Sequence, residues 1–202
     1  DDITEKRERE LINRKRRTRV LKQRQVIAEF AVSPFLRQGD VISFIRQVTE
    51  TVGRSFHLDR VSVWALEDNL ERLKLLDLFE LTGEKHSTGA VLEKSDYAGE
   101  FLLLTREKYV DADDPGILQE VPGYFKTYRQ KAGIQAMLDA SVRIGGKIYG
   151  VVCLESIKPR PEWTHDEIDF ASHVADQIGF AALNHERRDA EIAQRRDEGQ
   201  RE

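Results

Sequence analysis

The sequence has very little cysteine: Cys153 is the only one among 202 residues. A single thiol excludes an internal disulfide and any metal cluster built from cysteines alone, and it is typical of a protein from a reducing compartment. We therefore expect a cytoplasmic location. Long apolar runs are also missing, because no run approaches the roughly 20 residues of a transmembrane helix. We expect no membrane span in this segment, and the amino end is too charged for a signal peptide.

An excess of charge of one sign is absent as well. The chain has 32 basic and 36 acidic residues and a formal net charge of −4. No overall basic field attracts nucleic acid or anionic lipid, so we expect neither as a partner. The charges gather at the ends, in residues 5–24 and 186–202, where mixed-sign runs predict long polar helices or disordered tails. The length suffices for one core of ordinary size plus these ends.

Sequence motifs for catalysis are missing too. The histidines are scattered along the chain: His57, His86, His165, His173 and His185. No H-E-x-x-H, C-x-x-C, phosphate-binding loop, G-x-S-x-G or dinucleotide-binding glycine motif is present. Asp139 and Glu155 are a conceivable acid–base pair, but no nucleophile accompanies them, and Cys153 reads as a small core residue. We expect no catalytic residue, no metal and no cofactor, and predict that this segment is not an enzyme, although an output enzyme domain can lie outside it.

The most regular part of the sequence is residues 133–157. Two runs of β-branched and aliphatic residues flank Gly145-Gly146, and such a pair predicts a two-residue hairpin turn because these turns need positive φ. Both strands are apolar enough to lie in the middle of a sheet, yet each has one carboxylate, Asp139 or Glu155. Burying an unpaired carboxylate is costly, so each needs a partner or a wet cavity.

A long helix is predicted for residues 1–32, which lack glycine and proline. Its sparse stripe has spacings of seven, three and four, as in a weak coiled coil: Leu11, Thr18, Leu21, Gln25, Ala28 and Val32. We expect this helix to form a homodimer; the alternative is a single amphipathic helix packed on its own domain. Ser33 is expected to cap a second helix that begins at Pro34.

The pattern between residues 40 and 131 predicts a helix over 40–56, strands over 60–66 and 72–81, and a loop over 82–89. A less regular part follows, with helices over 95–107 and 124–131 and a short strand at 109–110. This part holds most of the tyrosines, and aromatic walls with a few polar groups line small-molecule pockets. The alternative is that these aromatic residues only cover one face of the sheet.

The last helix is predicted to begin near Thr164. Thr164 can cap it, Glu167 can reach back to the cap, and Trp163 can pack on Ile168. An apolar stripe continues along this helix, and we expect its residues to join the dimer interface: Ala171, Val174, Ile178, Ala181 and His185.

This order of elements resembles a GAF domain, a module that senses small molecules and dimerises in bacterial signalling proteins. The resemblance depends on three segments: DRVSVWAL at 59–66, GIQAMLDASVRIGGKIYGVVCLES at 133–156, and WTHDEIDFASHVADQIGFAAL at 163–183. It covers residues 25–186 approximately and is strongest to sensor histidine kinases and diguanylate cyclases. It implies an α+β fold with a central antiparallel sheet of five or six strands, the first and last helices packed together on one side and a ligand cavity on the other.

The same resemblance implies a domain division and a function. A signalling helix (1–32) would precede a GAF sensor domain (33–183) and a connecting helix (184–202). The domain would bind a small molecule or dimerise, or do both, and would relay the signal to an output domain, as in two-component systems; the alternative is a dimerising spacer that binds nothing. The implied pocket residues are Trp64, Asp77, Phe79, Tyr97, Phe101, Tyr109, Asp111, Tyr124, Tyr128, Met137, Asp139 and Glu155.

The ligand signatures of known GAF variants do not match this sequence. Bilin-binding relatives attach their chromophore to a cysteine in or near the pocket loops, and Cys153, in a predicted strand, does not match. Methionine sulfoxide reductases of this fold need several cysteines, and the Asn-Lys pair of cyclic-nucleotide binders is missing. Haem bound through His86, placed in a pocket-side loop, would have no other residue of its site beside it.

Overall fold

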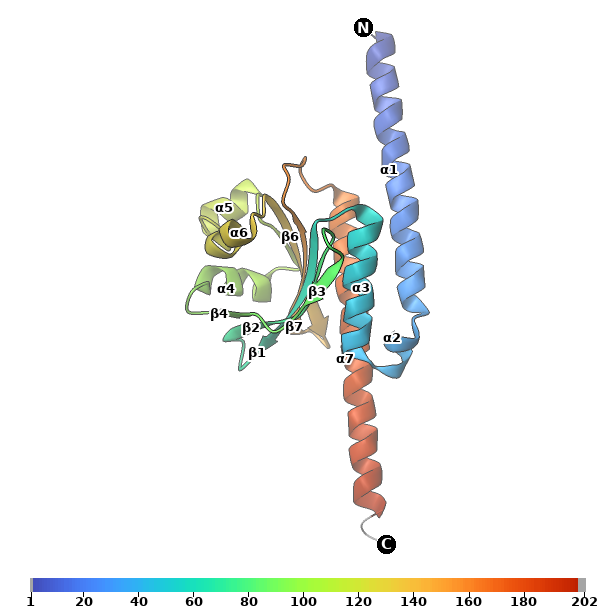
Figure 1. Cartoon of the computed structure of the whole chain (residues 1–202), viewed down its shortest axis with the longest axis vertical. Helices are drawn as coiled ribbons and strands as arrows, with labels where there is room; N and C mark the ends of the chain where they lie inside the picture. Colours follow the sequence, from blue (N-terminus) through green and yellow to red (C-terminus); the bar gives the residue numbers. More distant parts are fainter. Residues whose placement is uncertain (1, 200–202) are drawn as a thin grey trace.

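An antiparallel sheet divides the molecule into two helical layers (Figure 1). The computed structural model describes residues 2–199. The strands are β1 (Arg60–Glu67), β2 (Arg72–Glu80), β3 (Lys85–Ser87), β4 (Val91–Glu93), β5 (Tyr109–Asp111), β6 (Ala136–Ile144) and β7 (Lys147–Ser156). Their order is β3-β2-β1-β7-β6-β5, with β4 paired to β2. This confirms the predicted α+β fold.

The predicted hairpin is the centre of this sheet. Strands β6 and β7 are antiparallel neighbours, and Ile144 lies opposite Lys147 across the turn. Gly145 and Gly146 have φ values of 55° and 81°, the left-handed conformation that a two-residue turn of this kind requires. The Gly145-Gly146 pair in the sequence therefore correctly predicted the central hairpin of the sheet.

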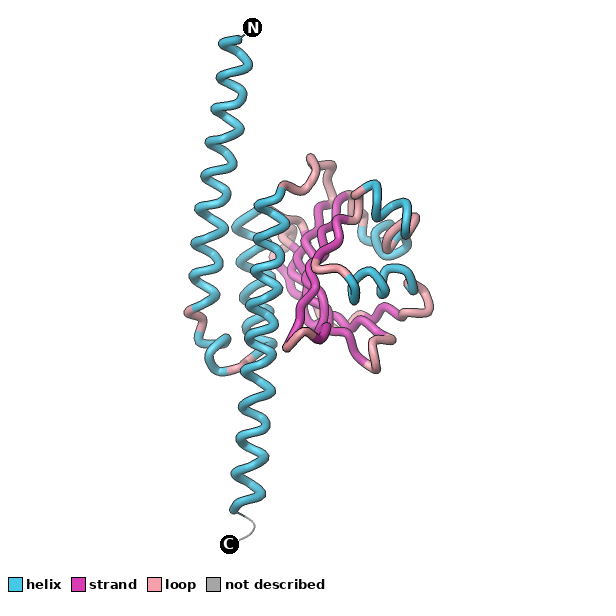
Figure 2. Tube along the Cα trace, turned by 180° about the vertical axis from the view of Figure 1, so that it is seen from behind, coloured by secondary structure: helices cyan, strands magenta, loops and turns pink. Residues whose placement is uncertain are grey.

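One face of the sheet is covered by α3 (Val41–Phe56) and α7 (His165–Gly199). Helix α1 (Asp2–Ala31) and the short α2 (Pro34–Gln38) lie outside them (Figure 2). Helix α3 buries one apolar stripe, including Phe44, Ile45, Val48 and Val52, because residues three and four apart share a helix face. Together with α7 and strands β1, β6 and β7, this stripe forms the first hydrophobic core.

The opposite face is covered by α4 (Ala98–Arg106), α5 (Pro115–Glu120) and α6 (Lys126–Ala132) (Figure 1). The predicted starts of two helices were wrong: α4 begins after Tyr97, and α6 begins after Phe125, whose φ of 46° is not helical. The predicted loop 82–89 contains β3, which pairs with Leu78–Glu80. Strand β4 and helix α5 were not predicted.

Helix α7 begins with the predicted capping box. The backbone N–H of Thr164 donates to Glu167 Oε2 at 2.9 Å, and the N–H of Glu167 faces Thr164 Oγ1 at 3.4 Å. Ser33 is the N-cap residue of α2 and Pro34 begins that helix, as predicted, but the Ser33 hydroxyl donates to Gln47 Oε1 at 2.6 Å and makes no cap bond.

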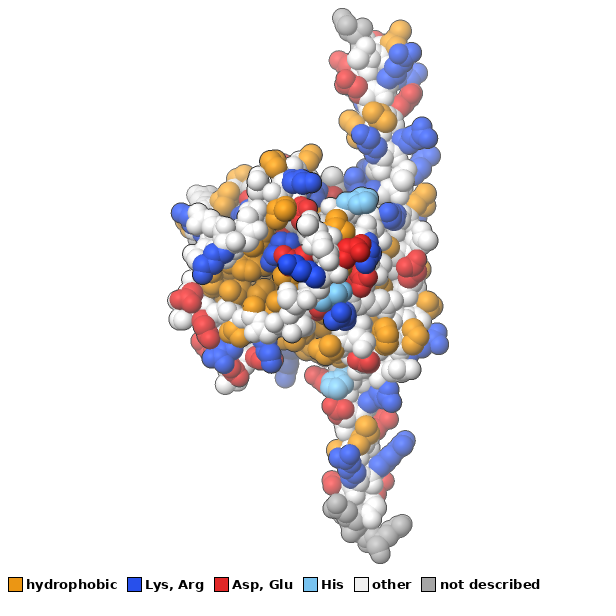
Figure 3. Space-filling model, viewed as in Figure 1, with side chains coloured by type: hydrophobic (Ala, Val, Ile, Leu, Met, Phe, Trp, Pro, Cys, Tyr) orange, Lys and Arg blue, Asp and Glu red, His pale blue; other side chains and the backbone are white. Residues whose placement is uncertain are grey.

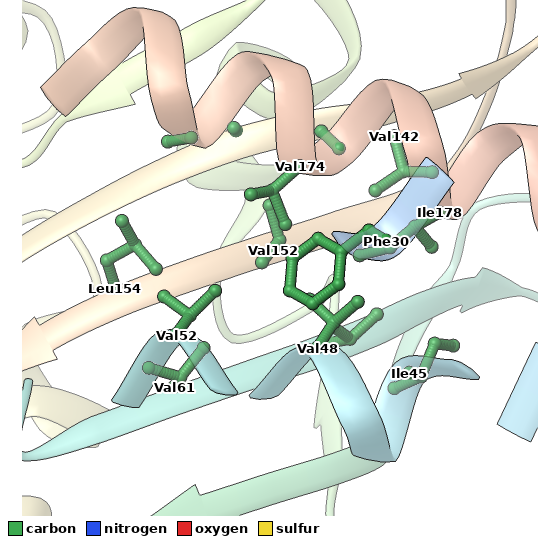
Figure 4. Close-up of a cluster of buried hydrophobic side chains, with 14 of the residues drawn as sticks. Phe30, Ile45, Val48, Val52, Val61, Val142, Val152, Leu154, Val174 and Ile178 are labelled. Carbon is green, nitrogen blue, oxygen red and sulfur yellow. The ribbon is translucent and has the colours of Figure 1, made fainter. Parts of the chain in front are cut away.

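Most of the predicted dimer stripe on α7 is internal, which corrects that prediction. Four of its residues have 0% exposure: Ala171, Val174, Ile178 and Ala181. Val174 and Ile178 point towards the sheet residues Val152 and Val142 (Figure 4). Spacings of three and four suit a helix on its own core as well as a coiled coil, so the pattern could not tell the two apart. His185 is outside this core, and its side chain is about half exposed.

The predicted stripe on α1 faces outward. Its members are exposed: Leu11, Thr18, Leu21, Gln25, Ala28 and Val32. The opposite face of α1 is held on the domain, where Arg19 makes two hydrogen bonds to Asp166, of 2.7 and 2.8 Å, and Gln23 makes one. The α1 stripe is therefore free to contact a second chain.

Two helix ends project from the body of the molecule. The amino-terminal part of α1 and the carboxy-terminal part of α7 extend in opposite directions (Figure 1). Charged side chains of both signs cover these projecting ends (Figure 3). Within residues 2–199, every helix is too short or too polar to cross a membrane.

Candidate functional site

The sheet face beneath α4 and α6 has polar groups within an apolar layer. Because side chains alternate along a strand, Ser62, Asp139 and Cys153 share this face with Trp64 and the second hydrophobic core. Asp139 and Ser62 lie opposite Cys153 on its two neighbouring strands. Among the charged or polar side chains of this layer, Ser62 and Glu155 are 0% exposed and Asp139 is 1% exposed.

Residues 124–128, which we name the aromatic segment, fill the space above this face. Tyr124 and Phe125 are buried, and the Phe125 ring lies 4.9 Å from both the Tyr124 and the Tyr97 rings. The Tyr128 ring meets Trp64 edge-on, at 5.8 Å. The left-handed backbone of Phe125 (φ 46°) is uncommon for a bulky residue and costs on the order of 1–3 kcal/mol. Surrounding contacts must therefore hold this segment in place.

Three buried carboxylates provide those contacts. The Tyr124 hydroxyl donates to Asp139 Oδ2 at 2.7 Å, and the Tyr128 hydroxyl donates to Glu155 Oε1 at 2.9 Å. The backbone N–H of Phe125 donates to Glu100 Oε2 at 3.1 Å. The exposure of the three acids is 1% for Asp139, 0% for Glu155 and 9% for Glu100. The aromatic segment is thus tied to the sheet and to α4 through acid groups.

Glu155 and Asp139 differ in what else they bind. Glu155 Oε2 accepts a 2.9 Å hydrogen bond from Arg60 Nε, and these two residues lie directly opposite each other on β7 and β1. Asp139 Oδ1 has no hydrogen-bond partner within residues 2–199. Glu155 is therefore neutralised by a cation, whereas Asp139 has one oxygen unsatisfied.

Burial raises the pKa of Asp139 to about 7, although the Cys153 thiol and the Tyr124 hydroxyl favour its charged form. Burial also raises the pKa of Glu155, and Arg60 opposes that rise. Since a buried carboxyl group is easier to keep neutral than charged, Asp139 exists in both protonation states near neutral pH.

The space left beside Asp139 is very small. A cavity of about 10 Å³ is lined by Trp64, Leu73, Leu92, Leu104, Phe125, Tyr128, Met137, Asp139, Val151 and Cys153. By this measure a site needs roughly 10–15 Å³ to hold one water molecule, so the cavity admits one water at most. A larger ligand fits only if the aromatic segment moves. Cys153 is 2% exposed, and burial raises the pKa of its thiol, so the thiol is unreactive as the structure stands.

Eight of the twelve predicted pocket residues meet in this layer: Trp64, Tyr97, Phe101, Tyr124, Tyr128, Met137, Asp139 and Glu155. Asp77 and Phe79 do not, and their prediction as pocket residues was wrong. They lie opposite Val63 and Val61, which face α3. Asp77 accepts hydrogen bonds from Thr49 on α3 at 2.5 Å and pairs with His86 at 2.8 Å, so His86 is also on the α3 side and not in a pocket-side loop.

Tyr109 and Asp111 are also outside the layer, because on β5 only Val110 turns towards it. Asp111 lies opposite Leu138, which belongs to the α7 face. Both line an open groove of about 800 Å³ at the sheet edge, together with Arg160 and Trp163. Burial raises the pKa of Asp111.

Two residues of the site were missed. Glu100 could have been found, because residues 97, 100 and 104 share a helix face and Glu100 is the acid on that apolar face. Arg60 could not, because only the register of β1 against β7 places it on Glu155. No group of three or more potential metal ligands occurs within residues 2–199.

The family model for the GAF domain matches residues 40–182. No curated protein sequence matches the chain.

Solved structures agree in fold. The phycocyanobilin-bound GAF domain of a cyanobacterial phytochrome has a TM-score of 0.64 at 16% identity, over 81% of this chain and 95% of that chain. The blue-light absorbing form of the Thermosynechococcus elongatus PixJ GAF domain gives 0.59 at 15% identity, over 80% and 94%. The GAF domain of an Acinetobacter phosphoenolpyruvate-protein phosphotransferase gives 0.58 at 17% identity, over 80% and 90%. At these identities the likeness concerns the fold alone.

Proposed function

Because the chain belongs to the GAF domain family, we propose that it is the sensory input module of a bacterial signalling protein. It binds a small molecule on the sheet face beneath the aromatic segment. It forms a homodimer through the outward stripe of α1, and it relays the bound state along α7 to an output domain of the histidine kinase or diguanylate cyclase type.

The single observation behind the ligand-binding part is the unsatisfied Asp139. Its Oδ1 is buried without a partner, and leaving a buried acceptor unpaired costs about 1–3 kcal/mol, more when it is charged. A core that served only for stability would gain from an apolar side chain at this position. A ligand that donates a hydrogen bond to Asp139 Oδ1 would offset this cost, which supports a ligand-binding role for this acid.

A physical route leads from the site to the helices. The aromatic segment continues through α6 and Gly133 directly into β6, whose residues on the other face, including Leu138 and Val142, pack in the core with α7. A change in the segment can therefore alter how α7 sits on the sheet. A ligand shifts the balance between two such arrangements only by binding them with different affinity.

The second candidate function is a dimerising spacer that binds nothing. It is favoured by the cavity of about 10 Å³, which the chain's own side chains have almost filled. In that case the hydrogen bonds from Tyr124 and Tyr128 to the acids are purely structural.

A metabolite screen with two measurements distinguishes the functions. For a sensor, at least one compound raises the Tm by several degrees and changes amide hydrogen exchange in residues 124–135 and in α7, because the ligand stabilises one arrangement. Cavity-filling variants such as Cys153→Met serve as controls that should abolish the effect. If no compound changes the Tm or the exchange, the spacer function replaces the sensor.

A further inference from the structure

The acid groups under the aromatic segment outnumber their cations. Asp139, Glu155 and Glu100 all accept hydrogen bonds from this segment. Within residues 2–199, Glu155 is ion-paired with Arg60 at 2.9 Å, and Arg60 is shared with Glu80 at 2.9 Å. Asp139 and Glu100 have no ion pair in the same part of the chain. The layer is thus rich in acceptors and short of positive charge.

The donors that now satisfy these acids are weak and incomplete. Two are neutral tyrosine hydroxyls and one is a backbone amide. The neutral Cys153 thiol also favours the charged form of Asp139, but no donor makes a hydrogen bond to Asp139 Oδ1 within residues 2–199. Asp139 is 1% exposed and lines the small cavity. In its ionised form this carboxylate can only accept hydrogen bonds, so the group that completes the site in that form is a donor.

The residues that line the cavity limit the chemical class of the ligand further. Trp64, Phe125 and Tyr128 place aromatic rings around Asp139, and aromatic faces attract cations. Paired N–H groups on a planar cation match both oxygens of a carboxylate, with hydrogen bonds roughly twice as strong as neutral ones. An anionic ligand would be repelled by ionised Asp139, and a ligand with acceptors alone could not hydrogen-bond to Asp139 Oδ1.

We propose that the ligand of this site is an organic cation of the amidinium, guanidinium or primary ammonium class, whose N–H groups replace the tyrosine hydroxyls on Asp139 and Glu155. This inference rests on the ligand-binding function proposed above and names its chemical class. Because the cavity holds only about 10 Å³, binding is an exchange in which the Tyr124 side chain leaves Asp139 and the cation takes its place. The exchange also frees Phe125 from its left-handed backbone (φ 46°), which removes part of the cost of opening.

Three small molecules with one ring and different charge test the class: benzamidine, benzamide and benzoate. Binding is followed by the fluorescence of Trp64 in a Trp163→Phe background, since these are the two tryptophans of the chain. We expect benzamidine to bind at least tenfold more tightly than benzamide, and benzoate not to bind. Equal or tighter binding of benzamide or benzoate would overturn the cation class while leaving the sensor function to the metabolite screen.

Two variants should change benzamidine affinity in opposite directions. Asp139→Asn removes the charge and should weaken binding at least tenfold, whereas Tyr124→Phe removes the competing hydroxyl and should strengthen it severalfold. If the Tyr124–Asp139 hydrogen bond only stabilised the fold, both variants would lower stability and neither would strengthen benzamidine binding. The matched control is Asp111→Asn, on the other face of the sheet, which should bind benzamidine like the parent. Absence of benzamidine binding to both the parent and Tyr124→Phe, each shown to be folded by circular dichroism, would overturn the inference.

Discussion

Asp139 occupies a strand position whose neighbours in the layer are apolar, so its protonation is coupled to folding. Its pKa is about 3.8 in an unfolded chain and about 7 in the folded one. Between these values the folded state keeps a proton that the unfolded state has lost. The free energy of unfolding therefore falls as pH rises from about 4 to about 7, and this contribution changes no further above that range.

The Asp139→Asn variant should lack this dependence. We expect the parent to lose on the order of 2–4 kcal/mol relative to the variant between about pH 4.5 and pH 8, at 1.36 kcal/mol per pKa unit. Urea unfolding of both proteins across this range measures the difference. Exposed Asp176→Asn is the control and should follow the parent; a parallel course of Asp139→Asn and the parent would contradict the expected pKa.

At the scale of elements, the contact between α7 and β6 depends on a missing side chain. A Cβ atom at Gly179 would lie 2.5 Å from the carbonyl oxygen of Arg143, far inside van der Waals contact. The helix can approach the sheet this closely only with glycine at this position.

Gly179→Ala should therefore push α7 away from β6. We expect a loss of about 1–3 kcal/mol, the usual cost of overpacking, even though alanine favours the helix by up to about 1 kcal/mol. Thermal unfolding measures it, and Asp176→Ala on the exposed side of α7 is the control. An unchanged or higher Tm for Gly179→Ala would show that the helix accommodates the methyl group without moving.

The elements also show what a sequence can and cannot predict. The β6–β7 hairpin and the α7 capping box were readable because their signals lie within a few residues. The start of α6 could not be predicted, because contacts with distant residues hold the Phe125 backbone in a left-handed conformation that a phenylalanine does not favour by itself. Eight of the twelve residues predicted for a pocket meet in the layer beneath the aromatic segment. Asp77 and Tyr109 do not, since which face of a strand points inward depends on its register with a distant strand.

At the scale of the whole molecule, the outward stripe of α1 is the surface that a homodimer would use. Leu21 on this stripe is 58% exposed. Leu21→Asp should convert a dimer to a monomer in sedimentation equilibrium, at unchanged circular dichroism, because two buried like charges would face each other. Ile178→Asp would test folding and not association, because Ile178 is in the core.

A matched substitution controls for the added charge. Leu102 on α4 is 59% exposed on the far side of the sheet, so Leu102→Asp should keep the mass of the parent. If Leu21→Asp leaves a dimeric mass unchanged, or if the parent is itself monomeric at high concentration, α1 is not the interface.

Helix α7 continues without interruption from the domain to Gly199. The number of residues in this helix therefore sets the angle at which a domain fused beyond it is held. Each residue of an α-helix turns the chain by about 100° and advances it by about 1.5 Å. One residue inserted after Leu183 would swing whatever is fused beyond Gly199 around the helix axis, and seven would bring it back to nearly its original azimuth. The activity of a fused reporter should then oscillate with insertion length, with the phase of a helical turn.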